Sequence, residues 1–460
     1  MSKKTYSKYP AYKDSGVEWL GGIPEGWETS RLRNVFSFSK GLTITKENLQ
    51  EEGVHCVNYG EIHSKFGFEV NPEIHVLKCV SEEYLISDSN SLLSKGDFVF
   101  ADTSEDIDGS GNFTYLNSDI RTFAGYHTVI ARLKIDVNER FAAYVITSQS
   151  FRNQIRRRVK GVKVFSITQS LLKTVIFWFP NEKEQIAIAN FLDDKTAKID
   201  RAIAQKEQLI ALLKERKQII IQNVVTKGLP AEERAKAGLD PKVKLKDSGV
   251  EWIGEIPEHW GVKKLKHLIK KSFSWGTPST DKLEYWDGGI PWISSVDIKS
   301  DFLAKTVREI SKKGLKRSSS NIAPKGSTVF VTRSGILQHT FAISILERDM
   351  AINQDIKCLV FVKDLFQTYF LRLIQGNNSK ILVETRQQAA TVESIDMDSF
   401  FNLQIPLPPF EEQKSIVYDI KAQSTKIEQA ISLQQTQIQK LKEYKATLID
   451  SVVTGKIKVD

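Results

Sequence analysis

Asp14–Trp27 has the sequence DSGVEWLGGIPEGW, and the same stretch returns at Asp247–Trp260 as DSGVEWIGEIPEHW, with 11 of 14 positions identical. A repeat of this length in a chain of 460 residues indicates a tandem duplication. A second matching pair lies downstream, where Pro180–Gln185 (PNEKEQ) aligns with Pro408–Gln413 (PPFEEQ) and both run without gaps to a VVT tripeptide. Each half of the chain therefore contains a box, a long middle segment and a helical segment, in that order.

The middle segments of the two halves, residues 27–180 and 260–408, have similar lengths but mostly different sequences. A weak similarity survives between Lys95–Phe100 (KGDFVF) and Lys325–Phe330 (KGSTVF). We therefore expect one shared fold with two different surfaces, which suits a protein that holds two different targets in a fixed relation. The expected domains are residues 1–179 and 247–407, with long helical segments at 180–228 and 408–460 and a linker at 229–246.

Short apolar runs broken by Gly, Asn and Ser predict strands in both middle segments. These runs are residues 97–100, 129–133, 175–179, 327–331 and 358–362. Two amphipathic segments, 144–159 and 365–375, predict helices. Each middle segment is therefore expected to be an α+β domain with loops long enough to carry specificity.

Residues 184–225 and 412–453 contain no Pro or Gly and are rich in helix-forming residues, so we expect two long helices. Apolar residues recur in both with the same heptad-compatible spacing, which predicts that the helices pair along this seam. The seam residues are Ile199, Ile203, Ile210, Leu213, Ile220, Val224, Ile427, Ile431, Ile438, Leu441, Leu448 and Val452. Lys206, Lys217, Gln434 and Lys445 interrupt the seam, which lowers stability but can fix register.

Antiparallel packing is the simplest arrangement, because a pseudo-twofold relation between the copies then puts one middle domain at each end. A helix of about 40 residues is roughly 60 Å long and can serve as a ruler. The expected fold class is α+β: two similar α/β domains separated by two long antiparallel coiled-coil helices. The outer helix faces carry charges of both signs, which fits either a solvated face or a partner-docking face.

The composition is that of a soluble globular protein, with 41% hydrophobic and 26% charged residues. Lys and Arg number 65 against 56 Asp and Glu, and the resulting charge of +9 favours a polyanionic partner. Cys56, Cys79 and Cys358 lack the spacing of a disulfide framework or a zinc site. No apolar run approaches the roughly 20 residues that span a bilayer, so we expect a cytoplasmic protein.

Three basic clusters fit contacts to DNA phosphates, although a run of charges is more often a solvated face. They are Arg152, Arg156, Arg157, Arg158, Lys160 and Lys163; Lys263 and Lys264, with further lysines to Lys271; and Lys312, Lys313, Lys316 and Arg317. Loop residues with hydrogen-bonding side chains are candidates for reading base edges, or else ordinary loop and capping residues. These are Asn58, Tyr59, Thr103, Ser104 and His127 in the first middle segment, and Arg333, Gln338, His339, Gln354, Arg386 and Gln388 in the second.

Catalytic and cofactor signatures are missing from the sequence. It contains no G-x-x-x-x-G-K-[ST], G-x-G-x-x-G, H-E-x-x-H or N-P-P-[YF] motif, and its seven histidines lack metal-ligand spacing. We therefore expect no catalytic residue and no metal site. The box tryptophans, Trp19, Trp27, Trp252 and Trp260, are expected to pin the chain against the domain cores.

The two boxes, the P-x-x-x-E-Q segments that open the helices and the VVT endings resemble the specificity (S) subunit of type I restriction-modification systems. The resemblance covers nearly the whole chain. It implies that each middle segment is a target recognition domain for one half of a bipartite, asymmetric double-stranded DNA site. It also implies that the helices set the spacer and dock two methyltransferase (M) subunits, and that restriction (R) subunits complete the enzyme.

The same resemblance implies that this chain has no cofactor of its own. S-adenosylmethionine would bind the M subunit, and ATP and Mg would bind the R subunit. The alternative from another class is a duplicated coiled-coil scaffold that binds only proteins, with the basic surplus incidental. A nuclease or methyltransferase fused into the chain would need a motif that the sequence lacks.

Overall fold

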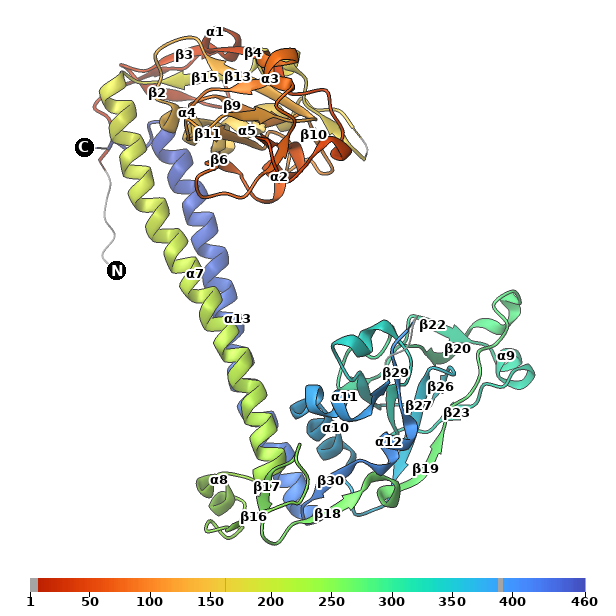
Figure 1. Ribbon diagram of the computed structural model, residues 1–460. Coiled ribbons are helices and arrows are strands. Elements are labelled where there is room, and N and C mark those ends of the chain that lie inside the picture. Colours follow the sequence, from red (N-terminus) through yellow and green to blue (C-terminus); the bar gives the residue numbers. More distant parts are fainter. Residues whose placement is uncertain (1–6, 162, 388–391, 460) are drawn as a thin grey trace. The chain divides into compact units, whose positions relative to one another are not determined.

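The computed structural model describes residues 7–161, 163–387 and 392–459 (Figure 1). The chain forms two compact units, Met1–Lys206 with Thr436–Asp460 and Glu207–Gln435. Each unit holds one middle domain together with part of each long helix. These helices are α7 (Glu182–Lys227) and α13 (Phe410–Val453).

Two sheets form the middle domain of the first unit, and their strands are antiparallel except for β11 with β6 and β12 with β5. The five-stranded sheet has the order β4 (Phe36–Lys40), β13 (Thr128–Leu133), β9 (Phe98–Ala101), β11 (Phe113–Leu116) and β6 (Phe68–Val70). The four-stranded sheet has the order β7 (Lys78–Val80), β5 (Val54–Val57), β12 (Thr122–Ala124) and β8 (Leu92–Leu93).

Short strands and helices complete the first unit. The strands are β1 (Tyr12–Asp14), β2 (Gly22–Pro24), β3 (Glu28–Arg31), β10 (Thr103–Ser104), β14 (Phe165–Ser166) and β15 (Ile176–Phe179). The helices are α1 (Leu32–Val35), α2 (Tyr59–Ser64), α3 (Tyr84–Ser87), α4 (Glu139–Thr147), α5 (Gln149–Arg156) and α6 (Gln169–Thr174), with 3-10 turns η1 (Lys46–Asn48) and η2 (Ser89–Ser91).

The second unit repeats both sheets in the same strand order. The five-stranded sheet runs β19 (Ile269–Phe273), β27 (Ile356–Phe361), β24 (Thr328–Val331), β25 (Ile343–Leu346) and β21 (Phe302–Leu303). The four-stranded sheet runs β22 (Arg308–Ile310), β20 (Trp286–Ile293), β26 (Met350–Ile352) and β23 (Ile322–Ala323). The parallel pairs, β21 with β25 and β20 with β26, occupy the same places as in the first unit. The expectation of one shared fold is confirmed.

Further strands and helices complete the second unit. The strands are β16 (Leu245–Asp247), β17 (Glu255–Pro257), β18 (Gly261–Lys264), β28 (Arg386–Gln387), β29 (Ser394–Ile395) and β30 (Gln404–Leu407). The helices are α8 (Ala231–Lys236), α9 (Lys312–Arg317), α10 (Gln367–Gly376), α11 (Asn378–Thr385) and α12 (Met397–Asn402), with 3-10 turns η3 (Leu265–Leu268), η4 (Leu283–Tyr285) and η5 (Gly335–Gln338). Helix α8 therefore lies within the segment 229–246.

The predicted seam pairs the two long helices within each unit. Every one of the twelve seam residues is buried or half-buried, whereas neighbours such as Leu212 and Ile219 are exposed. The lysines that interrupt the seam bind side chains of the other helix. In the first unit, Lys206 Nζ lies 2.5 Å from Gln437 Oε1, and Lys445 Nζ lies 2.7 Å from Asp200 Oδ2. In the second unit, Lys217 Nζ lies 2.5 Å from Glu428 Oε1. Residues late in α7 thus face residues early in α13, so the pairing is antiparallel.

The repeated boxes pin the chain to each core, as predicted. Each box contains the turn and the second strand of a short hairpin, β1 with β2 in the first unit and β16 with β17 in the second. Trp27 and Trp260 are each 1% exposed in the core of their unit. Gly16 and Gly249 both have a φ of +72°, a left-handed conformation that favours glycine. The motif is therefore structural.

One secondary-structure prediction is wrong. The segment 144–159 is not one helix but two, because α4 ends at Thr147 and α5 begins at Gln149. Ser148 separates them: its Oγ accepts a hydrogen bond from Phe151 N at 3.2 Å and so caps the second helix. All five predicted strands lie within one or two residues of β9, β13, β15, β24 and β27, and the helix expected at 365–375 corresponds to α10.

Candidate nucleic-acid interface

A loop platform follows the central strand β9 of the first unit. Asp102 N donates to His127 O at 3.0 Å, and Ile167 N donates to Asp102 O at 2.7 Å. Strand β10 then pairs with β14, with Thr103 opposite Ser166. These bonds bring together three loops that are far apart in the sequence, and we call them the first platform (residues 102–112, 125–128, 160–161 and 163–168).

The second unit builds the equivalent platform after β24. Thr332 N donates to Asp355 O at 2.8 Å, and Ile395 N donates to Thr332 O at 2.8 Å. Arg333 forms an isolated bridge with Ser394, at the place where Thr103 of strand β10 pairs with Ser166 of β14. The second platform (residues 332–341, 353–355, 386–387 and 392–396) thus repeats the backbone bonds of the first but differs from it in many side chains.

The first platform borders a cavity of about 690 Å³ that Thr103 and His127 line together with Lys40, Tyr126 and Gln169. The Tyr59 ring meets the His127 ring edge-on at a centroid distance of 5.3 Å, and His127 Nδ1 lies 3.2 Å from Asp102 Oδ1. Imidazole, hydroxyl and amide groups can all hydrogen-bond to base edges. The structure therefore brings Thr103 and His127 to one hollow, with Tyr59 in contact with His127.

Two candidate readers of the first domain lie in its interior instead. Asn58 is 2% exposed and forms a capping box at the start of α2 with Glu61. Ser104 is 5% exposed, and its Oγ donates to Asp106 O at 2.7 Å. Both side chains stabilise the local backbone, so their placement counts against a direct base contact.

On the second platform, Arg333, Gln338 and His339 are exposed. Arg386 supports this loop, because its Nη1 donates to Gln338 O at 3.2 Å. Gln354 is exposed at the edge of the platform, where its Oε1 accepts from Thr277 Oγ1 at 2.5 Å. Gln388 lies outside the described residues. The candidates of the second domain thus gather on one surface.

The basic cluster of the first domain divides into two groups. Arg152 and Arg156 hold the loop 106–112: their Nη2 atoms donate to Asp108 O at 3.0 and 2.6 Å. Burial, together with the charge of Arg156, lowers the pKa of Arg152 to about 10. The other members, Arg157, Arg158, Lys160 and Lys163, are exposed. Within this cluster, these four side chains are exposed and can contact phosphates. The bonds of Arg152 and Arg156 to the loop do not support the prediction that these two residues contact phosphates.

The basic residues of the second domain lie on two separate elements. Lys263 and Lys264 are exposed on β18, which pairs with β30. Helix α9 packs beside η4 and β20 (Figure 1) and exposes Lys312, Lys316 and Arg317. The remaining member, Lys313, is ion-paired with Glu284 at 2.5 Å.

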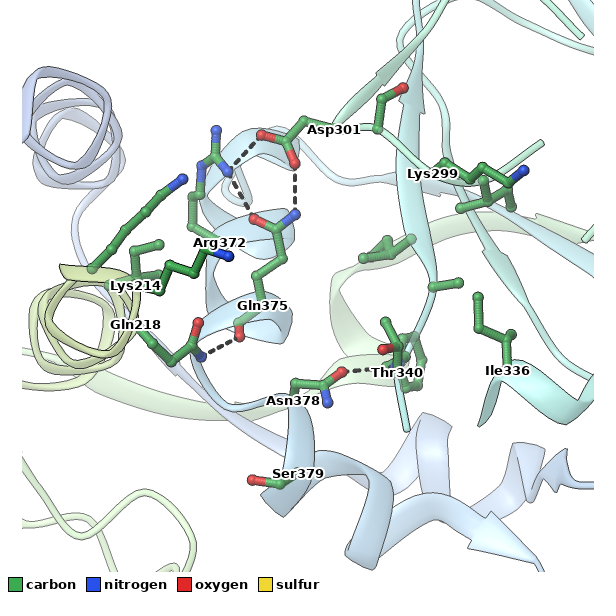
Figure 2. Close-up of a pocket in the computed structure, with 17 residues that line it drawn as sticks. Lys214, Gln218, Lys299, Asp301, Ile336, Thr340, Arg372, Gln375, Asn378 and Ser379 are labelled. Carbon is green, nitrogen blue, oxygen red and sulfur yellow. Dashed lines mark hydrogen bonds and ion pairs between the residues drawn. The ribbon is translucent and has the colours of Figure 1, made fainter. Parts of the chain in front are cut away.

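A cleft of about 730 Å³ lies in the second unit between its middle domain and α7 (Figure 2). Gln218 Nε2 on α7 donates to Gln375 O at 2.8 Å. Inside the domain, Arg372 Nη1 lies 2.6 Å from Asp301 Oδ2, and Gln375 Nε2 donates to Asp301 Oδ1 at 2.7 Å. Figure 2 shows this chain of contacts from α7 to Asp301. Sequence reasoning missed it, because none of these residues belongs to a motif.

Within residues 7–161, 163–387 and 392–459, no group of three or more His, Cys, Asp or Glu side chains is close enough to hold a metal ion. None of the helices in this part of the chain combines the length and the apolar character that a membrane crossing requires.

Comparison with known proteins gives a family match in both halves. The family model of the type I restriction modification DNA specificity domain matches residues 24–212 and 257–443. The EcoR124I/EcoR124II specificity subunit of Escherichia coli is 27% identical over 267 residues, which are 54% of this chain and 62% of that protein. The alignment thus spans less than two thirds of this relative. The MjaVIII specificity subunit of Methanocaldococcus jannaschii is 21% identical over 97% of both chains.

Two solved structures share the fold. One, from work on complex assembly and conformational transition of the type I R-M system, has a TM-score of 0.66 and 15% identity over 94% of this chain and 98% of its own. The HsdS subunit of Thermoanaerobacter tengcongensis has a TM-score of 0.51 and 15% identity over 95% of this chain and 98% of its own.

Proposed function

The chain belongs to the type I restriction modification DNA specificity family, and from this premise we propose that it selects the DNA target of such a system. Each platform reads one half of a bipartite, asymmetric site. The observation that carries the proposal is the pair of platforms, which share their backbone hydrogen bonds but differ at positions such as Thr103 and Arg333 or His127 and Asp355. Two similar scaffolds with different reading surfaces suit two different half-sites.

Base reading falls to the exposed side chains of the platforms. Arg333 has a guanidinium that can donate two parallel hydrogen bonds to O6 and N7 of a guanine, and Gln338 can pair similarly with an adenine. Thr103 and His127 offer smaller groups around a hollow in the first domain. The exposed lysines and arginines beside the platforms contact phosphates, which fix position but carry no sequence information.

The paired helices set the spacer between the half-sites and dock the methyltransferase subunits. A second apolar stripe on α7 supports docking: Leu209, Leu212 and Ile219 are 41%, 54% and 47% exposed. They recur at intervals of three and seven residues, as the seam does, but lie outside the seam. A partner helix can bury such a stripe. Catalysis belongs to the partners: S-adenosylmethionine binds the M subunits, and ATP and Mg bind the R subunits.

A pool of random duplex DNA tests the proposal. The chain, assembled with its methyltransferase subunits and S-adenosylmethionine, is expected to methylate duplexes that share one bipartite motif with one spacer length. The measurement is sequencing of the methylated fraction. A methylated fraction without a shared motif would contradict the proposal, and so would a motif that is a single uninterrupted block.

A further inference from the structure

A dense polar cluster joins the first recognition domain to α7. Arg140, in the first turn of α4, points its Nε at Asp193 of α7, with distances of 2.8 Å to Oδ1 and 3.1 Å to Oδ2. Its Nη1 contacts Glu69 and donates to Tyr115 Oη at 2.8 Å. The guanidinium also lies over the ring of Phe68, 4.8 Å from its centroid. One side chain thus connects two strands of the sheet to the helix.

Asp193 accepts from a second group of the domain. Tyr144 Oη, one turn along α4, donates to Asp193 Oδ1 at 2.6 Å and lies 3.2 Å from Thr196 Oγ1. Burial and the hydrogen bond to Asp193 raise the pKa of Tyr144, so its hydroxyl keeps its proton and remains a donor. Burial alone would lower the pKa of Arg140, but its bonds to Tyr115 and Asp193 outweigh that effect and raise it. Arg140 therefore keeps its charge and Tyr144 keeps its proton at neutral pH.

The position of the cluster along α7 allows it to influence the orientation of the domain. At the start of α7, Gln185 Oε1 accepts from Asn138 N at 2.8 Å and Glu184 Oε1 accepts from Trp27 Nε1 at 3.0 Å. Asp193 lies eight residues beyond Gln185 along α7, about 12 Å at 1.5 Å per residue. Attachments at separate points along the helices define a direction, and the cluster shares this role with two bonds to α13, from Ser150 N to Asp450 Oδ1 at 2.9 Å and from Trp178 Nε1 to Val453 O at 2.5 Å. The apolar contacts of Ile188 and Leu192 lie between Gln185 and Asp193 and stabilise the attachment by hydrophobic burial, which has no preferred direction.

The second unit keeps the first attachment and replaces the other. Gln413 Oε1 accepts from Phe366 N at 2.8 Å, as Gln185 does from Asn138. By this alignment, Arg140, Tyr144 and Asp193 correspond to Thr368, Arg372 and Lys421, which cannot form the same cluster. The second domain contacts the other long helix, α7, through neutral bonds from Gln218 to Gln375 O (Figure 2) and to Gly376 O, whereas the first domain contacts α13 through Ser150 N and Asp450 Oδ1. Each domain is thus attached to the helix pair by its own set of contacts, which we call its joint.

We infer that Arg140 and Asp193 are positioning residues that fix the direction in which the first recognition domain projects from the helix pair, and thereby restrict the spacer length that the protein accepts. The inference rests on the proposed function. It assigns no base contact to either residue. Loss of the joint therefore changes the tolerated spacer and leaves the base preference within each half-site unchanged.

Methylation of a spacer library tests this inference. The full-length chain with its methyltransferase subunits acts on duplexes that carry both half-sites, with spacers from three base pairs shorter to three longer than the preferred one. Arg140→Gln and Asp193→Asn are each expected to raise methylation of sites one base pair off the preferred spacer at least tenfold relative to the wild type. Tyr144→Phe, which removes a single bond to Asp193, is expected to have a smaller effect in the same direction.

Arg132→Gln is the matched control. Arg132 is as exposed as Arg140, 30% against 29%, and its Nε lies 3.0 Å from Asp97 Oδ2. Its bonds to Asp97, Ser39, Asn90 and Leu92 all stay within the recognition domain. The control is expected to keep the wild-type spacer profile. Spacer profiles of Arg140→Gln and Asp193→Asn that match the control would overturn the inference, and so would a change in half-site sequence. Failure of the proposed function is separate: the wild type itself would then show no bipartite motif.

Discussion

The two recognition domains share their strand order and the hydrogen bonds of their platforms. Some platform positions are identical, such as Ser104 and Ser334 or Ser166 and Ser394, but many others differ. The position that holds Thr103 in the first domain holds Arg333 in the second, and Asp355 replaces His127. The backbone therefore determines where a target is read, and the side chains determine which target is read. Such a division lets one domain change its target without disturbing the scaffold or the other domain.

The segments that open the long helices show the opposite pattern. Gln185 and Gln413 are both buried and make the same bonds, to a backbone N–H of the domain and to a proline carbonyl. Glu184 and Glu412, the residues before these glutamines, have different partners. Glu184 accepts from Tyr9 and Trp27, whereas Glu412 accepts from Arg234 and His259. The repeated motif is thus explained by the attachment of helix to domain.

The largest effect is expected from an exchange of residues 28–165 with the corresponding segment of a relative. Because all of the first platform except residues 166–168 lies in this segment, one half of the DNA site should change completely and the other should stay the same. Sequencing of the methylated DNA measures this. A change in both halves would show that the two domains do not read independently.

The next largest effect concerns the two glutamates that open the helices. Arg234 and Glu412 are 5% and 1% exposed, so Arg234→Met leaves a buried carboxylate with only His259 and should cost about 3 kcal/mol or more of stability. In the first unit, Tyr9→Phe removes one hydrogen bond to Glu184, a loss of about 1.5–3 kcal/mol. Calorimetric melting compares the two variants. Equal shifts in Tm would mean that the partners of the two glutamates are energetically equivalent.

A single platform residue should affect a single base pair. Arg333→Ala is expected to relax discrimination at one position of one half-site by about 1–3 kcal/mol, because a bidentate contact to a base contributes that much. His127→Ala should act only on the other half-site. Binding to duplexes with single base-pair changes provides the measurement. If Arg333→Ala lowered the affinity equally for all sequences, Arg333 would be a phosphate contact instead of a base contact.

The smallest effect is expected from the lysines of α9. Lys312→Gln should reduce the slope of log affinity against log salt by about 0.9, the value for one phosphate contact. Lys313→Gln is the matched control, because Lys313 is already paired with Glu284 and should change the slope less. Titrations at several salt concentrations distinguish the two. Equal slopes for wild type and Lys312→Gln would remove α9 from the interface.

Features with a short period or an exact repeat could be predicted from the sequence. The duplication, the heptad seam and the strands around Phe98 and Val329 follow from local patterns, and the structure has them. The break at Ser148 was missed because the segment is amphipathic on both sides of it, while the serine side chain competes for the backbone. Helix propensity alone does not register such a cap.

The residue-level site was less predictable, because it depends on contacts between distant segments. Asn58 and Ser104 have the side chains of base readers, yet the fold uses them inside the domain. Arg152 and Arg156 belong to a basic run, yet they hold a loop that lies more than 40 residues earlier. The cluster of Arg140 and Asp193 left no sequence signal, since its members lie on four separate elements, α4, α7, β6 and β11.

The central claim is that this chain determines the target sequence of a type I restriction-modification system. Long-read sequencing of methylated adenines in host DNA, in the intact strain and in one deleted for this chain, tests it most directly. The account predicts that methylation at one bipartite motif is present in the intact strain and lost in the deletion. Unchanged methylation would contradict it.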